Sequence, residues 1–149
     1  MKIDVSVSQV NINIPEHLDE VRSKRFWTFA ATEWHRLYEP YVPYHEGILA
    51  NTVTIIGGRG NGEIHHTAPY ARYQYHGKAY GPSYPIMRNG VIVGYRSPKG
   101  LPKHPTGKSL QYKRDQHPLA SAFWDKAAQP TQLPKLIRSM QRYIDSGRL

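Results

Sequence analysis

The chain lacks cysteine and has no long apolar run. Its 149 residues include no Cys, which excludes a disulfide framework and any metal site built from thiolates. No apolar stretch approaches the ~20 residues that a membrane-spanning helix needs. The first residues also lack the apolar segment of a secretory signal peptide. The composition therefore predicts a soluble protein without a membrane partner, made in a reducing cytoplasm.

Acidic side chains are scarce in the second half of the chain. Lys and Arg number 20 against 11 Asp and Glu, a formal net charge of +9. Residues 1–95 carry 9 basic and 8 acidic side chains, whereas residues 96–149 carry 11 and 3, so the two parts have net charges of +1 and +8. A positive half attracts polyanions such as nucleic acid through contacts with phosphates. A solvated surface that only keeps the protein soluble is the alternative interpretation.

Tyrosine, glycine and proline are abundant, with 11, 12 and 12 copies. Glycine and proline indicate many turns and loops. Tyrosine is favoured at protein interfaces because its large ring can be buried while its hydroxyl stays polar, although it also fills ordinary cores. The length suits one domain over residues 1–149.

Apolar periodicity predicts a strand and then a long helix at the start of the chain. Residues 1–14 alternate apolar and polar positions, which predicts an edge strand or an extended arm that pairs with a neighbouring subunit. We predict a helix over residues 15–38, with Pro15 in its first turn. Its apolar stripe has helical spacing and consists of Phe26, Phe29, Ala30, Trp34, Leu37, Tyr38 and Tyr41.

The next part of the chain favours a β-hairpin and a short helix. Residues 51–56 and 63–67 are predicted strands, because the first is rich in β-branched residues and the second follows a turn. The glycine-rich segment 57–62 supplies that turn. A short helix is expected over residues 69–76, ending at Gly77.

A long loop and hairpin region precedes the last helices. Residues 78–118 are rich in turn residues, and the Asn89-Gly90 pair between apolar residues predicts a hairpin. Loops of this length usually serve contacts or function. We then predict a short helix over residues 118–129, closed by Pro130, and a C-terminal helix over residues 131–146. The fold class is α+β, with a small antiparallel sheet packed against the long N-terminal helix and the C-terminal helix.

Patterns for catalysis and metal binding are weak. The glycine-rich segment is not a phosphate loop, because no Gly-Lys-Ser/Thr follows it. His65 and His66 are adjacent and would point to opposite faces of a strand. A three-histidine site assembled from distant segments stays open, but no metal-binding spacing is present. We therefore predict that the protein is not an enzyme and needs no cofactor.

Tyrosines and basic residues interleave over residues 70–80. Such a stretch can stack on bases while its cations contact phosphates. It lacks the signatures of the common sequence-reading modules. These residues therefore keep one functional hypothesis open, a small basic nucleic-acid-binding protein acting in the infected cell.

Three segments together resemble one family of phage proteins. Residues 41–52 (YVPYHEGILANT), 62–78 (GEIHHTAPYARYQYHGK) and 117–127 (HPLASAFWDKA) are similar, in order and spacing, to segments of the minor capsid and tail-completion (neck) proteins of long-tailed bacteriophages. The order and spacing of these segments agree with the family layout over the full length of the chain. Residues 81–107 are unusually elaborate here, and the resemblance implies no role for them.

The resemblance implies a structural protein of the virion neck, made in the cytoplasm of the bacterial host. Its expected form is a homo-oligomeric ring, six-fold in this family, that completes the tail and joins it to the DNA-filled head. The implied partners are the head connector or stopper and the tail terminator or tail-tube proteins, with non-specific contact to the DNA in the channel. Large aromatic rings are the candidate interface residues, namely Tyr41, Tyr70, Tyr73, Tyr75, Phe123 and Trp124. Basic residues of the second half are the candidate contacts to channel DNA or to an acidic partner, namely Arg96, Lys99, Lys103, Lys108, Lys113 and Arg114.

Overall fold

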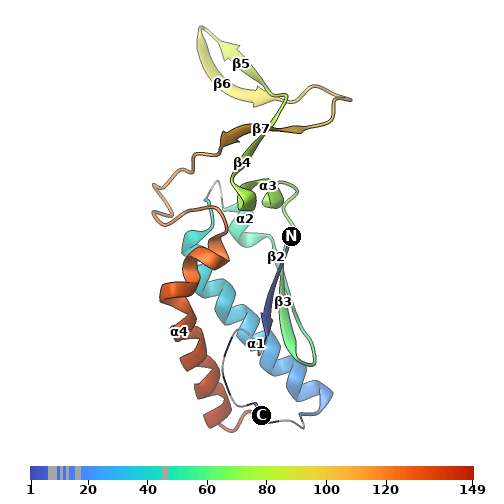
Figure 1. Ribbon diagram of the computed structural model, residues 1–149, viewed down its shortest axis with the longest axis vertical. Coiled ribbons are helices and arrows are strands. Elements are labelled where there is room, and N and C mark those ends of the chain that lie inside the picture. Colours follow the sequence, from blue (N-terminus) through green and yellow to red (C-terminus); the bar gives the residue numbers. More distant parts are fainter. Residues whose placement is uncertain (7–9, 11, 13, 16–17, 45–46) are drawn as a thin grey trace.

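The protein has an α+β fold, as the sequence predicts. The computed structural model describes residues 1–6, 10, 12, 14–15, 18–44 and 47–149. Figure 1 shows a body that holds the two long helices and a three-stranded sheet, and a narrow β-structure that projects from one end of it. In chain order the elements are β1 (Lys2–Ser6), α1 (Glu20–Tyr38), the 3-10 helix η1 (Glu39–Tyr41), α2 (Ile48–Asn51), β2 (Val53–Gly57), β3 (Asn61–His66), α3 (Ala71–His76), β4 (Lys78–Gly81), β5 (Tyr84–Arg88), β6 (Val91–Arg96), β7 (His104–Ser109) and α4 (Trp124–Asp145).

The sheet of the body is antiparallel and has the strand order β1-β3-β2. The predicted hairpin forms β2 and β3, with Gly57 opposite Gly62 at its closed end. β1 pairs with β3 of its own chain, with Ile3 opposite Ile64. Lys2–Ser6 thus form the predicted edge strand, within the sheet of their own chain. Residues 7–9, 11 and 13 of the predicted strand or arm lie outside the described residues.

Helix α1 begins at Glu20, five residues later than predicted. Asp19 is its N-cap, and the Asp19 side chain accepts a hydrogen bond of 2.8 Å from the backbone N–H of Arg22. A capping carboxylate satisfies one of the free N–H groups at a helix start and so fixes the boundary there. Pro15 lies outside the helix. Residues 16–17 lie outside the described part of the chain.

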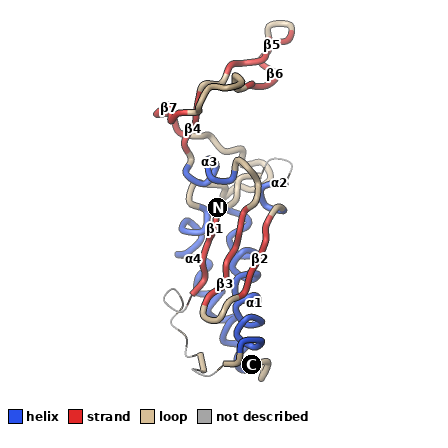
Figure 2. The backbone as a smooth tube through the Cα atoms, turned by 90° about the vertical axis from the view of Figure 1, so that its right-hand side faces the viewer, coloured by secondary structure: helices blue, strands red, loops and turns tan. Residues whose placement is uncertain are grey.

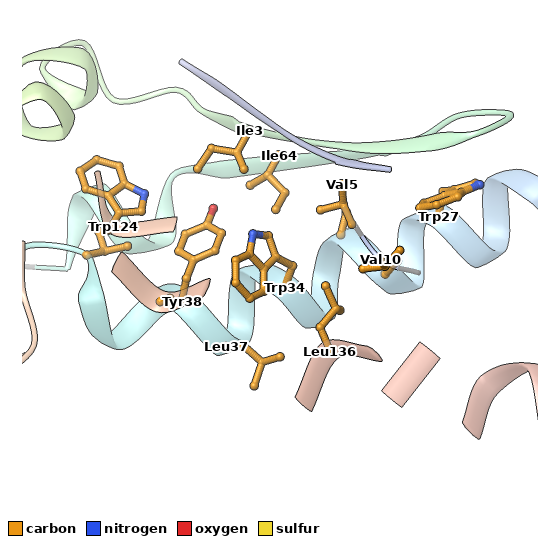
Figure 3. Close-up of a cluster of buried hydrophobic side chains, with 14 of the residues drawn as sticks. Ile3, Val5, Val10, Trp27, Trp34, Leu37, Tyr38, Ile64, Trp124 and Leu136 are labelled. Atoms are coloured by element: carbon orange, nitrogen blue, oxygen red, sulfur yellow. The ribbon is translucent and has the colours of Figure 1, made fainter. Parts of the chain in front are cut away.

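Helix α1 packs on two partners at once, the sheet and helix α4. The predicted stripe is buried apart from the half-buried Phe29 and Tyr41. Trp27 and Ala31 are buried as well, because a helix between two layers needs an apolar surface wider than one stripe. Figure 3 shows core side chains from α1, β1, β3 and α4 meeting between the layers. They include Ile3, Val5, Trp34, Leu37, Tyr38, Ile64, Trp124 and Leu136.

Two glycines let α1 approach the sheet closely. A Cβ atom on Gly62 would lie 2.5 Å from the carbonyl oxygen of Trp27 and 2.8 Å from the Cβ of Ala31. A Cβ atom on Gly57 would overlap the backbone of Lys24. The glycine-rich segment therefore supplies more than a turn, since its two end residues are contact points for the helix.

The C-terminal helices are one continuous helix, which differs from the prediction of a break at Pro130. α4 runs from Trp124 to Asp145 with Pro130 and Pro134 inside it. A proline removes one N–H donor and leaves the carbonyl four residues earlier without its helical partner. Both prolines lie on the exposed side, where water can bond to those carbonyls, while Ala128 and Leu136 are buried on the other side. Burial of this continuous apolar face stabilises the helix through the proline positions.

Candidate functional site

The most distinctive feature of the molecule is the projecting β-structure, which we name the arm and define as residues 78–110. Figures 1 and 2 show that it extends from the end of the body at α3. Its two ends are held together at its base, where the N–H of Leu110 donates a hydrogen bond of 2.8 Å to the carbonyl of Gly77. Gly77 ends α3 with a φ of 66°, and this left-handed turn directs the chain into the arm.

The arm consists of two two-stranded units. β4 pairs with β7 near the body, and β5 pairs with β6 farther out. The predicted hairpin at Asn89-Gly90 is confirmed, with φ angles of 50° and 75° at these two residues. Positive φ at both central residues is the geometry of a type I′ turn, which Asn-Gly favours. A groove of about 660 Å³ lies along β4 and β7, and its lining includes Tyr80, Lys108 and, from β6, Tyr95.

The hairpin β5–β6 exposes many apolar side chains. Residues 83–93 are all exposed. In a strand pair with one buried face, alternate residues would be covered, but here neither face is. The exposed apolar residues, with their exposed fractions, are Tyr84 53%, Ile86 39%, Met87 54%, Val91 62%, Ile92 50%, Val93 57% and Tyr95 67%.

The arm is also strongly basic. No Asp or Glu occurs from Ile64 to Arg114. Six Lys and Arg residues lie on the arm itself, and none of them joins an ion pair within the described part of the chain. The ion pairs of the body, by contrast, already engage its acidic residues Asp19, Glu20, Glu33 and Glu63. The unpaired cations of the arm are thus available to an external anion.

The structure brings four of the six predicted basic residues together on the arm. Arg96 lies at the end of β6, Lys99 and Lys103 lie in the loop before β7, and Lys108 lies on β7. Lys113 and Arg114 follow the arm on the segment that returns to α4. All six are exposed.

The predicted aromatic residues are divided between the surface and the core. Tyr75, Phe123 and Trp124 form one cluster, with the ring centroid of Tyr75 5.0 Å from that of Phe123 and 4.9 Å from that of Trp124. Trp124 has an exposed fraction of 0%, so the expectation that it contacts a neighbouring subunit is wrong. Its indole ring is buried in the core, whereas Phe123 is 40% exposed.

Of the other three predicted tyrosines, Tyr73 is exposed, whereas Tyr41 and Tyr70 are half-buried and pack against the core. Tyr73 is 38% exposed and packs its ring on Tyr80 of the arm. Tyr70 lines a pocket of about 250 Å³ together with Pro43, Leu49 and Gln74. The Tyr41 hydroxyl lies 2.9 Å from the Thr131 hydroxyl and so links η1 to α4.

A buried polar cluster joins α1, β3 and the start of α4. The Tyr38 hydroxyl lies 2.8 Å from His66 Nε2, and His66 Nδ1 lies 3.4 Å from the carbonyl of Leu49. Because a carbonyl can only accept, His66 carries its proton on Nδ1 and accepts at Nε2 from Tyr38. Burial lowers the pKa of His66 to about 4. Nearby, Tyr75 donates a hydrogen bond of 2.8 Å to Asp125.

The low pKa of His66 predicts a loss of stability in mild acid. Above pH 6.5 His66 is neutral in both the folded and the unfolded chain, so its contribution does not change with pH. Between pH 6.5 and about 4 only the unfolded chain takes up the proton, so the free energy of unfolding falls by about 3 kcal/mol over this range. The burial of His35 lowers its pKa and adds to the loss in the same direction.

Urea denaturation at pH 7.5, 5.5 and 4.5 would measure this loss. His66→Gln is the matched variant, because it keeps a polar side chain but cannot titrate, and its unfolding should depend less on pH. If the free energy of unfolding depended equally on pH in the wild type and in His66→Gln, the loss of stability in acid could not be attributed to His66.

The histidines and helices give no sign of a metal centre or a membrane span. Within the described residues, no group of three His, Cys, Asp or Glu side chains lies close enough to hold a metal ion. His65 and His66 do face opposite sides of β3, with His66 buried and His65 2.9 Å from Glu63. No described helix is long and apolar enough to cross a membrane.

Sequence reasoning missed the exposed apolar side chains of the arm. The Asn-Gly pair within residues 87–92 predicts a hairpin, but apolar residues around a turn do not reveal whether the body covers them. The predicted basic set does not include Lys78 and Arg88, although both lie on the arm. A sequence signal marks the wider region that contains the arm, namely the absence of Asp and Glu from Ile64 to Arg114.

Comparisons of the chain with protein-family models, with curated proteins and with solved structures found no match.

Proposed function

We propose that this protein is a structural component of the neck of a long-tailed bacteriophage, where it forms a ring that completes the tail and joins it to the DNA-filled head. The proposal combines the resemblance of three segments with one structural observation. That observation is the arm, a projecting and basic β-structure whose apolar side chains are uncovered in the single chain.

An uncovered arm supports an assembly role. Contiguous exposed apolar surface is rare in proteins that work as monomers and marks sites of protein contact. An isolated two-stranded hairpin is only marginally stable in water, so β5–β6 gains stability when a partner covers it. The body supplies a rigid core from which such a contact can be presented.

The arm's cations favour contact with DNA as a second role. This property also suits the alternative function, a small basic nucleic-acid-binding protein acting in the infected cell. The two functions differ in whether the protein stays in the finished particle. In the neck role the cations face DNA in the channel or an acidic neighbouring protein, and the contact is independent of base sequence.

Replacing two arm cations should weaken binding to duplex DNA and its dependence on salt. For Lys99→Gln/Lys103→Gln we expect the slope of log K against log salt concentration to fall by about 2, since each phosphate contact contributes about 0.9. The matched control is Lys135→Gln/Arg138→Gln, which removes the same charge from exposed positions of α4. Fluorescence anisotropy of a labelled duplex, recorded across a salt series, measures the affinity and its salt dependence for both variant pairs. Equal effects of the two pairs would show that the arm is not the contact.

The neck role is tested by the composition of particles and by a deletion. Mass spectrometry of purified virions from the phage that encodes the chain should find it in a fixed ratio to the tail proteins. Deletion of its gene should leave filled heads and separate tails. A protein absent from virions, with joined particles formed without it, would overturn the proposal and favour a role in the infected cell.

A further inference from the structure

The outer hairpin of the arm has two open strand edges. β5 and β6 pair only with each other, and no other described strand adjoins them. Their side chains are exposed on both faces. Open edges offer unpaired N–H and C=O groups to any strand that can approach, and this is a common basis of association between chains.

The body has an open strand edge of similar length. β2 lies at the edge of the three-stranded sheet, and in the described part of the chain no strand pairs with its outer side. β2 has five residues and β5 has five. On β2, Thr54 is exposed and Ile56 is 48% exposed, so an apolar side chain lies beside this free edge.

The arm and residues 1–63 have opposite charges, although the body as a whole, with 14 basic and 11 acidic residues outside the arm, has a net charge of +3. The arm has six Lys and Arg residues and no acidic residue, whereas residues 1–63, which include the whole sheet except the end of β3, have 6 basic and 8 acidic residues, a net charge of −2. Asp4 and Glu63 lie opposite each other on β1 and β3. An approaching basic hairpin is therefore attracted to the body's sheet.

Within one chain the hairpin does not reach β2. Figures 1 and 2 place β5–β6 at the far end of the arm, well beyond α3, while β2 runs along the body. The hairpin can therefore meet the β2 edge only of a different molecule.

We propose that hairpin β5–β6 of one subunit adds to the free edge of β2 in a second copy of this chain and extends its sheet. The inference rests on the homo-oligomer of the proposed function and names the contact that builds it. Backbone hydrogen bonds along the edge provide the pairing, and the hairpin's apolar residues cover Ile56.

Cross-linking between copies tests the contact, because the chain has no natural Cys. Thr54→Cys would be prepared as one protein, and Met87→Cys or Val93→Cys as another. Mixing them with a short bismaleimide should give cross-linked dimers of one Thr54→Cys chain with one hairpin-variant chain. Val21→Cys, 65% exposed on α1, is the control and should not link to the hairpin variants. Equal linking of Val21→Cys, or no linking of Thr54→Cys, would overturn the proposal.

Association strength gives a second, independent test. Ile56→Lys and Val93→Lys each place a charge in the contact and should weaken self-association at least about tenfold in sedimentation velocity. Val21→Lys changes an apolar residue on α1 that is 65% exposed, against 48% for Ile56 and 57% for Val93, and it should leave association unchanged. The inference would be overturned if the wild-type chain stayed monomeric, or if Ile56→Lys and Val93→Lys left the strength of self-association unchanged.

The outcomes separate this contact from the neck role. A chain present in the neck that associates through other surfaces would overturn the β2 contact and leave the proposed function standing. A chain that forms the β2 contact but is absent from virions would overturn the proposed function instead. Protection of the hairpin cysteines by duplex DNA without links to Thr54→Cys would assign the hairpin to nucleic acid and overturn the contact.

Discussion

Replacing Trp124 by alanine is expected to lower the free energy of unfolding by about 3–5 kcal/mol, since large-to-small changes at buried aromatic residues leave a cavity. Trp124 is fully buried. Its ring meets Tyr75 at a centroid distance of 4.9 Å and His66 at 5.3 Å, so it joins α4 to α3 and β3. Guanidinium denaturation followed by circular dichroism would measure the loss.

The neighbouring Phe123 provides the control. It is 40% exposed and rests on Tyr75 from the outside, so Phe123→Ala should cost only about 1 kcal/mol. If the proposed assembly uses this exposed ring, Phe123→Ala would weaken association more than folding. Equal losses of folding stability at the two positions would contradict the division into a core residue and a surface residue.

Gly62→Ala and Gly57→Ala are each expected to cost about 3 kcal/mol, as overpacking in a tight contact does. The added methyl group would collide with the backbone of α1, at the Trp27 carbonyl for Gly62 and at Lys24 for Gly57. Backbone atoms cannot rotate away as side chains do, so the helix must move from the sheet. Thermal and denaturant unfolding would both report the change.

Gly60→Ala is the matched control within the same turn. Nothing lies within 4 Å of a Cβ atom at Gly60, so this variant should change stability by no more than about 0.5 kcal/mol. A similar loss at Gly60 would mean that the glycines serve turn flexibility and not helix packing.

The fold class could be predicted because its main elements have local signals. The apolar stripe from Phe26 to Tyr38 has helical spacing, and burial alternates from residue to residue along β2 and β3. The Asn89-Gly90 turn and the end of α3 at Gly77 follow from backbone preferences of single residues. Such signals need no knowledge of the rest of the chain.

Boundaries that depend on tertiary contacts could not be predicted in the same way. Pro130 normally ends a helix, but the buried face of α4 continues through it because the proline lies on the exposed side. The start of α1 was placed at Pro15, whereas the side chain of Asp19 caps the helix. The contacts of Gly57 and Gly62 with α1 have no local signal beyond glycine itself.

The candidate site was predicted in part. Its basic residues were identified from the charge of the second half, and four of the six lie together on the arm. Trp124 is wrongly predicted as an interface residue, because the sequence alone does not distinguish a large aromatic residue of the core from one on the surface. The arm itself was predicted only as a long loop and hairpin region, since its projection from the body is a property of the whole fold.

The most direct test of the central proposal is a cryo-electron microscopy map of the neck of the intact virion, resolved well enough to trace the sequence. The account predicts a ring of this chain between the head connector and the tail tube, with the arm residues Arg96, Lys99 and Lys103 directed at DNA or at an acidic neighbouring protein. A fully traced neck that contains no copy of this chain would contradict it.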